Sequence, residues 1–139
     1  MKTLIVDDDV VGREILSQIL TPYGPVDTAK DGISALCAVI DSHEQGDPYN
    51  LICLDILMPA LDGQSTLRKI RLLERARGIQ GLDGCRIIMT TAVSDKQNIL
   101  KAFNAQCEAY LVKPIQKIRL LREIVGLGLL SHTEHLNQG

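Results

Sequence analysis

Residues 4–9 of the chain read Leu-Ile-Val-Asp-Asp-Asp, a short apolar run followed at once by three carboxylates. An apolar run of this length, bounded by polar residues, is typical of a buried strand. Apolar residues then recur at helical spacing at Val11, Ile15 and Ile19. The chain is therefore predicted to open with a strand, an acidic turn and a helix over roughly residues 9–21.

The same alternation continues along the sequence. Further buried strands are predicted at residues 26–29, 49–54, 86–89 and 109–112. Apolar residues at helical spacing mark further helices within residues 33–40, 67–73, 99–103 and 115–124. Five strands that alternate with five helices predict an α/β fold, in which a doubly wound five-stranded parallel sheet has helices on both faces.

Length and composition exclude several classes of protein. With 139 residues, the chain has room for one domain. A net charge of -2 and an aromatic content of 3% argue against direct nucleic-acid binding through phosphates or stacked bases. No apolar stretch approaches the ~20 residues of a membrane span, so no membrane insertion is predicted. The first apolar run is too short for a signal peptide, which predicts a cytoplasmic protein.

The cysteines and histidines indicate neither a disulfide framework nor a zinc site. No Cys-x-x-Cys pair is present, and three of the four cysteines stand inside apolar runs. Buried free thiols are therefore predicted. The three histidines bring no metal-ligand spacing with them.

Polar residues with a shared chemistry follow the predicted strands. In an open α/β sheet, ligands bind outside the carboxyl ends of the strands. The residues at these ends are Asp7, Asp8 and Asp9 after the first strand, Asp55 after the third, Thr90 and Thr91 at the fourth, and Lys113 with Pro114 after the fifth. Crowded carboxylates favour a hard cation such as Mg²⁺. A carboxylate could then attack phosphorus, while a lysine and a hydroxyl hold the other phosphoryl oxygens.

Taken together, these motifs resemble the receiver domain of bacterial two-component response regulators. The matching pieces are residues 4–9, residues 54–59 with Asp62-Gly63, the pair Thr91-Ala92, and residues 110–114. The resemblance covers residues 1–126 as the receiver domain and leaves residues 127–139 as a partly frayed C-terminal tail. It implies the flavodoxin-like receiver fold with strand order 2-1-3-4-5.

The resemblance also assigns roles around a magnesium ion. It implies that Asp55 is the phosphoacceptor and a metal ligand. Asp8 would bind Mg²⁺ directly, Asp7 would do so through water, and the backbone carbonyl of Leu57 would complete the protein ligands. In this family the hydroxyl of Thr91 and the ammonium of Lys113 hold phosphoryl oxygens. Thr90 competes with Thr91, and only the Thr-Ala pair of the family pattern favours the latter.

A switch and a set of partners follow from the same resemblance. The Lys113-Pro114 bond is expected to be cis, and Tyr110 is expected to change its rotamer with the hydroxyl of Thr91. The change would remodel the face made by the fourth helix, fifth strand and fifth helix, where a homodimer contact is left open. The phosphodonor would be a histidine kinase or phosphotransfer protein. No output domain follows residue 126, which predicts a stand-alone switch that signals through a downstream protein partner.

Simpler explanations compete with each of these roles. Asp9 is expected to cap the first helix, and Asp55 on its own could be a turn former. Lys113 on its own could be a solvated lysine. Five basic residues make the third helix basic, and a solvated face is favoured over a docking surface for an acidic partner; they are Arg68, Lys69, Arg71, Arg75 and Arg77.

Two other functions remain as alternatives. The run that begins at Asp7 also fits the five-residue Asp-x-Asp-x-Val signature of haloacid dehalogenase-like phosphatases, in which Asp7 would be the nucleophile and Asp9 the acid/base. That interpretation leaves Asp55 unexplained and finds no acidic pair after Lys113. The other alternative is a phosphorylation-independent binding module.

Two apolar residues predict a long-lived phosphoryl group. Leu57 and Val93 stand two residues after Asp55 and Thr91, at positions that line the route of the hydrolytic water in the family. Because neither side chain can orient a water molecule, slow self-dephosphorylation is expected. The glycine-rich loop at residues 78–84 is interpreted as a surface insertion.

Overall fold

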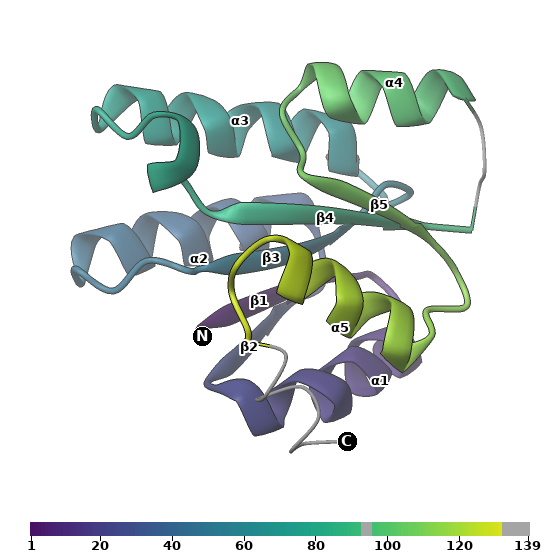
Figure 1. Cartoon of the computed structure of the whole chain (residues 1–139). Helices are drawn as coiled ribbons and strands as arrows, with labels where there is room; N and C mark the ends of the chain where they lie inside the picture. The colour runs from purple at the N-terminus through teal and green to yellow at the C-terminus, as the bar shows by residue number, and fades with distance from the viewer. Residues whose placement is uncertain (93–95, 132–139) are drawn as a thin grey trace.

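A five-stranded parallel sheet forms the centre of the molecule (Figure 1). The computed structural model describes residues 1–92 and 96–131 of the chain. Every neighbouring pair of strands is parallel, in the order β2-β1-β3-β4-β5, which confirms the predicted fold. The strands are β1 (Thr3–Val6), β2 (Val26–Ala29), β3 (Leu51–Asp55), β4 (Arg86–Thr91) and β5 (Ala109–Val112).

Within the described residues, five helices cover the two faces of this sheet. Their bounds are α1 (Val10–Leu20), α2 (Gly32–Glu44), α3 (Gly63–Ala76), α4 (Lys96–Asn104) and α5 (Lys117–Gly126). Two short 3₁₀ turns, η1 (Thr21–Tyr23) and η2 (Gly81–Asp83), follow α1 and α3. An aspartate caps each of the first three helices by accepting a backbone N–H, and the capping residues are Asp9, Asp31 and Asp62. Among the described residues, no helix has the length and apolar character needed to cross a bilayer.

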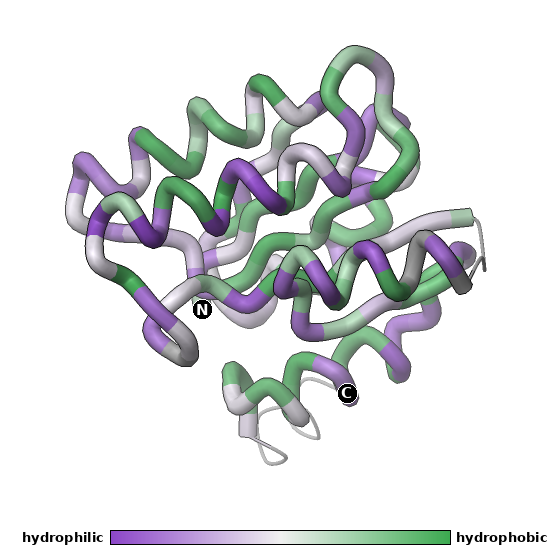
Figure 2. The backbone as a smooth tube through the Cα atoms, turned by 90° about the horizontal axis from the view of Figure 1, so that it is seen from above, coloured by the Kyte–Doolittle hydropathy of each residue, from purple (hydrophilic) through white to green (hydrophobic). Residues whose placement is uncertain are grey.

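Buried side chains form one cluster on each face of the sheet. Side chains of α2, α3 and α4 pack on one face, and those of α1 and α5 pack on the other. Every residue of β1 and β3 is buried, as expected for parallel strands that are covered on both faces. The hydropathy colouring of Figure 2 shows apolar strands in the middle and helices that alternate between polar and apolar residues.

The chain continues to pack on the domain after α5 ends. Leu130 is buried in the cluster on the α1 and α5 face, and Leu127 and Leu129 are packed against it. This part of the predicted tail therefore contributes to the core. Residues 132–139 of the predicted tail lie outside the described residues.

The cysteines follow the predicted pattern with one exception. All four are free thiols. Cys53 and Cys107 are buried and Cys85 is partly buried, but Cys37 is exposed on α2. Burial raises the pKa of Cys53 to about 12 and that of Cys107 to about 11. A cysteine in an apolar run of an amphipathic helix can still face solvent, because one side of such a helix is exposed.

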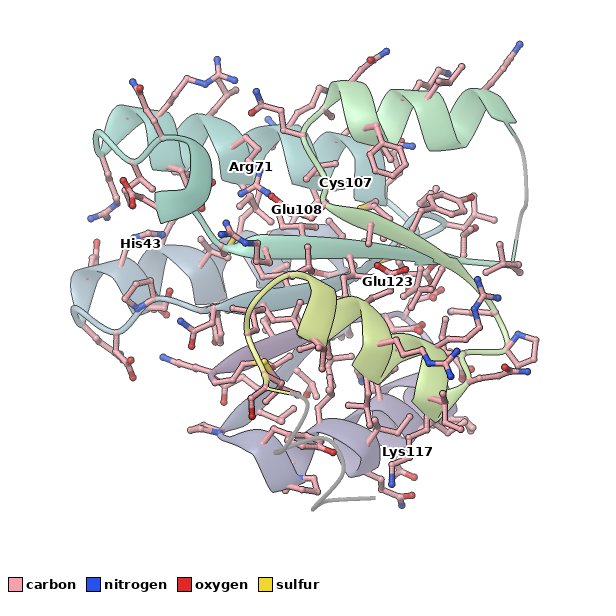
Figure 3. The ribbon with its side chains drawn as sticks, in the orientation of Figure 1. His43, Arg71, Cys107, Glu108, Lys117 and Glu123 are labelled. Atoms are coloured by element: carbon pink, nitrogen blue, oxygen red, sulfur yellow. The ribbon has the colours of Figure 1, made fainter. Side chains whose placement is uncertain are left out.

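Arg71 corrects the prediction that the basic residues of α3 form a solvated face. Its side chain is buried, and its guanidinium lies between α3 and the start of β5, beside Glu108 (Figure 3). Nη1 donates to Glu74 Oε1 at 2.6 Å and to the Cys85 carbonyl at 2.8 Å. Nη2 donates to both carboxylate oxygens of Glu108, and Nε donates to the Gln106 carbonyl at 2.9 Å.

The two carboxylates of this network also bind backbone. Glu74 Oε2 accepts from the Cys85 N–H at 2.7 Å, and Glu108 Oε2 accepts from the Ile87 N–H at 2.5 Å. All five guanidinium N–H groups of Arg71 have acceptors, so the buried charge is fully compensated. The network fastens α3 to the beginnings of β4 and β5. A Cβ atom on Gly84 would lie 2.9 Å from the Glu74 carboxylate oxygens.

Replacing Arg71 by methionine should destabilise the domain by about 3–5 kcal/mol, because the buried Glu74 and the partly buried Glu108 lose their cation. Urea unfolding measures the effect, and Arg71→Met/Glu108→Gln should recover part of the loss. Arg75→Met is the matched control on the same helix, and its exposed side chain should cost less than about 0.5 kcal/mol. Equal losses for the two single variants would contradict the structural role of the network.

Candidate functional site

Three carboxylates meet at the carboxyl edge of the sheet, where β1 and β3 lie side by side. One oxygen from each of Asp7, Asp8 and Asp55 lies within 4.8 Å of the other two. Asp7 and Asp55 are buried, with 1% and 4% of their surface exposed, whereas Asp8 faces solvent. The structure therefore brings together three of the four acidic residues that the sequence places at this edge, and the fourth, Asp9, caps α1.

The strand register accounts for this meeting. Val6 of β1 and Leu54 of β3 are register partners. Asp7 and Asp55 are the residues that follow them directly. Neighbouring strands are about 4.8 Å apart. The side chains of Asp7 and Asp55 therefore meet at the strand ends. Asp8, the residue after Asp7, lies on the solvent side.

Lys113 connects the two buried carboxylates. Its Nζ donates to Asp7 Oδ2 at 2.8 Å and to Asp55 Oδ2 at 3.2 Å. Burial alone would lower the pKa of Lys113, but the hydrogen bonds and charges of the two aspartates outweigh it and raise that pKa. Burial, together with the charge of Asp7, raises the pKa of Asp55 against the opposing effect of Lys113. One ammonium thus only partly compensates three carboxylates.

Asp7 is held by contacts that the sequence did not reveal. Its Oδ1 accepts the Asp9 N–H at 2.9 Å, and its carbonyl accepts from Nη1 of Arg13 at 2.7 Å. A Cβ atom on Gly12 would lie 2.6 Å from Asp7 Oδ2, so the carboxylate needs a glycine here. A glycine inside a predicted helix is the signal that was available, because it costs ~1 kcal/mol relative to alanine and indicates a close approach.

The arrangement does not support the phosphatase alternative. Asp9 caps α1, as expected, by accepting the Val11 N–H on its Oδ1 at 3.2 Å. Asp7, the nucleophile in that alternative, is almost fully buried and uses one oxygen for Lys113 and the other for the Asp9 N–H. Asp55, which that alternative leaves unexplained, is instead part of the acidic cluster.

The loop after Asp55 packs directly on the start of α3. The Leu57 N–H donates to Asp55 Oδ1 at 3.3 Å, and the Leu57 side chain is 56% exposed. The Gly63 N–H donates to the Ile56 carbonyl at 2.9 Å. A Cβ atom on Gly63 would lie 2.1 Å from the Asp55 carbonyl oxygen, so only glycine allows this contact.

Both candidate threonines are buried at the end of β4. Thr90 is the register partner of Asp55, and its carbonyl accepts the Ile56 N–H at 2.9 Å. Thr91 is the register partner of Val112, and its carbonyl accepts the Lys113 N–H at 2.6 Å. The structure therefore brings the backbones of both threonines to the site, and the preference for the Thr91 hydroxyl remains a prediction.

The remaining predicted residues occupy β5 and the loops beside it. The Lys113-Pro114 peptide bond is cis, as expected. Tyr110 is partly buried and packs against the core cluster on the face of α2, α3 and α4. Val93 lies outside the described residues.

The donor set fits a magnesium ion. Three carboxylates and one ammonium leave an excess of negative charge at the site. Mg²⁺ prefers oxygen ligands, keeps several waters and is typically bound by one or two carboxylates. The exposed Asp8 leaves one side of the cluster open to solvent.

The chain matches a known protein family over most of its length. Residues 3–125 match the family described as the response regulator receiver domain. The chain belongs to this family. The receiver domain is 30% identical over 117 residues to the chemotaxis protein CheY of Halobacterium salinarum. The alignment covers 84% of this chain and 87% of that protein.

Larger signalling proteins contain similar segments. The receiver domain is 38% identical over 125 residues to the hybrid signal transduction histidine kinase L of Dictyostelium discoideum. The alignment covers 89% of this chain but 7% of the kinase. The receiver domain likewise spans 13% of the probable histidine kinase 2 of Oryza sativa subsp. indica. The receiver domain thus corresponds to a small part of these kinases.

Solved structures show the same fold. The CheX-CheY-BeF3-Mg+2 complex from Borrelia burgdorferi contains a chain with a TM-score of 0.79 and 26% identity, covering 94% of this receiver domain and 90% of that chain. The receiver domain of an Arabidopsis thaliana histidine kinase complexed with Mg²⁺ has a TM-score of 0.74 and 27% identity, covering 88% and 90% of the two chains.

Magnesium should stabilise the folded receiver domain, because unfolding disperses the three carboxylates. At a Mg²⁺ concentration of about ten times the Kd, the gain should be about 1.4 kcal/mol. Thermal unfolding with and without MgCl₂ measures it. Asp8→Asn should abolish the response, whereas Asp9→Asn is the matched control and should retain it, because asparagine also caps helices. A full response in Asp8→Asn would contradict this metal site.

Proposed function

We propose that this receiver domain accepts a phosphoryl group on Asp55 from the phosphohistidine of a histidine kinase or phosphotransfer protein. The observation that supports this function best is the Lys113 ammonium, which bonds two buried carboxylates beside a third, exposed one. A structural ion pair would need only one carboxylate. The excess negative charge instead suits a site that takes up a cation and an incoming phosphoryl group.

In the transfer, an Asp55 carboxylate oxygen attacks the phosphorus of the donor. A new O–P bond forms as the P–N bond of phosphohistidine breaks, and its electron pair returns to the imidazole nitrogen. The attacking carboxylate must be deprotonated. Lys113 helps to keep it so, because its charge opposes the burial that raises the Asp55 pKa.

The proposed magnesium ligands are Asp8 and Asp55 directly, Asp7 through water, and the Leu57 carbonyl. When bound, the ion supplies positive charge that stabilises the incoming phosphoryl oxygens. The support for this assignment is the cluster of carboxylates and the presence of Mg²⁺ in the related receiver structures. Lys113 and the Thr91 hydroxyl would hold the remaining oxygens of the transferred group.

The donor is proposed to approach along α1. Val11 and Ile15 are 58% and 48% exposed on this helix. They line a cavity of about 410 Å³ that also reaches Asp7 and Lys113. An apolar surface beside the acceptor would hold a donor protein while its phosphohistidine reaches Asp55.

The downstream partner is proposed to bind the face made by α4, β5 and α5. Tyr110 on β5 would respond to the hydroxyl of Thr91 when the phosphoryl group binds there. Leu100, Phe103 and Ile118 are 61%, 46% and 58% exposed on the two helices. These apolar side chains suit a downstream protein or a second copy of the domain.

Incubation with acetyl phosphate and Mg²⁺ should add one phosphoryl group to the wild-type domain, detected by intact mass. The adduct should be absent without Mg²⁺ and absent in Asp55→Asn. Asp41→Asn, an exposed site on α2, is the matched control and should be labelled like the wild type.

Other outcomes would overturn the proposal. An adduct that persists in Asp55→Asn would make Asp7 the acceptor and favour the phosphatase alternative. A wild-type domain that is never labelled, even by a phosphorylated histidine-kinase donor, would be a phosphorylation-independent binding module.

The phosphoryl group on Asp55 should be long-lived, because the Leu57 side chain offers no hydrogen bond to an attacking water. Introducing one with Leu57→Asn should speed hydrolysis by about fivefold, the equivalent of one hydrogen bond of about 1 kcal/mol. The decay of the phosphorylated mass after removal of the donor gives the rate. A wild-type half-life of only seconds would refute the hypothesis.

A further inference from the structure

The charges of this chain are segregated between its two halves. Residues 1–62 contain three basic and eleven acidic residues, a formal charge of -8. Residues 63–131 contain twelve basic and five acidic residues, a formal charge of +7. The small net charge of the whole chain therefore conceals two large and opposite charges.

The topology turns this division of the sequence into a division in space. The first half supplies β2, β1 and β3, which are consecutive in the sheet, together with α1 and α2. The second half supplies β4 and β5 at the other side, together with α3, α4 and α5. The basic half of the sequence thus supplies the β4 and β5 side of the sheet, with α3 and α4 on one face and α5 on the other (Figure 1).

Helix α3 carries the densest group of these cations. Its exposed charged residues are all basic, and its one acidic residue, Glu74, is buried and bound to Arg71. We define the basic face of α3 by its exposed residues Arg68, Lys69, Leu72 and Arg75, together with Arg77 at the C-cap.

The helix dipole accounts for only part of the composition of this face. Interaction with the helix dipole favours Arg75 and Arg77 near the C-terminus, but it does not favour Arg68 and Lys69 in the middle of the helix. Leu72 lies among the four cations and is 57% exposed. Arg68, Leu72 and Arg75 are spaced as i, i+4 and i+7, so they line one side of the helix.

A cavity continues the basic face at the C-terminal end of α3. It has a volume of about 430 Å³, and Arg75 belongs both to its lining and to the basic face. Ile79, Gln80 and Arg86 line its other walls. The carboxylates of Glu74 and Glu108 also border it, but both are bound to Arg71 and to backbone N–H groups.

We infer that the basic face of α3 and this cavity form a docking surface for an acidic segment of a partner protein. Carboxylates of the partner pair with the arginines and with Lys69, while an apolar side chain between them packs on Leu72. Arginine binds carboxylates through two parallel hydrogen bonds, which suits this occupant. One acidic side chain of the partner enters the cavity beside Arg75.

Two other classes of occupant fit this surface less well. A single-stranded nucleic acid that binds without sequence preference stacks its bases on aromatic side chains of the protein, and the basic face has none. A membrane-bound helix buries a broad apolar face, whereas here Leu72 is the one exposed large apolar side chain of α3. The surface lies on the opposite face of the sheet from α1, and the inference does not depend on the proposed phosphoryl transfer.

The test uses a fluorescent helical peptide in which glutamates flank a central leucine, and a second peptide with glutamine in place of each glutamate. Fluorescence anisotropy is measured with the unphosphorylated domain in Mg²⁺-free buffer, so the result is separate from that of Asp55 labelling. We expect the glutamate peptide to bind in a salt-sensitive way and the glutamine peptide to bind at least tenfold more weakly.

Charge reversal locates the surface. Arg68→Glu/Arg75→Glu should weaken peptide binding about tenfold, because two ion pairs become repulsive. Lys117→Glu/Arg122→Glu changes the net charge equally on the exposed face of α5 and should leave the affinity unchanged. Leu72→Ala should weaken binding while leaving its salt dependence intact. Circular dichroism verifies that each variant is folded.

Several results would overturn the inference. Equal losses for the two double variants would show that only the overall charge matters. Equal binding of the two peptides would exclude a role for carboxylates. Stronger binding of a single-stranded DNA oligomer or of phosphatidylserine vesicles, lost in Arg68→Glu/Arg75→Glu, would assign the surface to those ligands. A salt-sensitive dimer in sedimentation velocity, lost in the same variant, would make the occupant a second copy of the domain.

Discussion

The ammonium of Lys113 between Asp7 and Asp55 is the contact on which the arrangement of this domain depends. It joins residues at the ends of three strands, β1, β3 and β5, at the edge of the sheet where the charged side chains of the site lie. Two buried carboxylates this close could not both stay ionised without a cation. Because one cation compensates them only in part, the edge is stable enough to fold and still favours additional positive charge. The glycines at positions 12 and 63 are consequences of this edge, since they allow backbone and carboxylate to approach closely.

The opposite end of the sheet solves a similar problem in a different way. There, Arg71 meets two carboxylates and two backbone carbonyls, and every guanidinium N–H finds an acceptor. A buried charge that is fully paired stabilises one conformation strongly and offers little to a ligand. Lys113 and Arg71 therefore represent two uses of a buried cation in one small fold. Lys113 leaves the carboxyl edge of the sheet with excess negative charge that a ligand can compensate. Arg71 holds α3 against β4 and β5.

Much of the fold and of the site could be predicted from the sequence. Apolar runs located the strands, and parallel strands bring their carboxyl ends to one edge, so Asp7, Asp55 and Lys113 were expected to meet. Burial of Arg71 could not be predicted, because its partners Gln106 and Glu108 lie 35 and 37 positions further along the chain. Helical spacing placed it among solvated cations. The spacing of apolar residues also could not decide between Thr90 and Thr91, because both stand at the end of the same strand. In the structure both are buried.

The segregation of charge gives the molecule a permanent electric dipole that runs along the sheet from the β2 side toward the β5 side. A dipole of this kind interacts with the field of a charged partner before the surfaces touch, and it turns the domain during diffusion. Encounters then begin from a restricted set of orientations, and the association rate depends on ionic strength even where the final contact contains few ion pairs. A domain with almost no net charge can in this way approach partners as selectively as a strongly charged one.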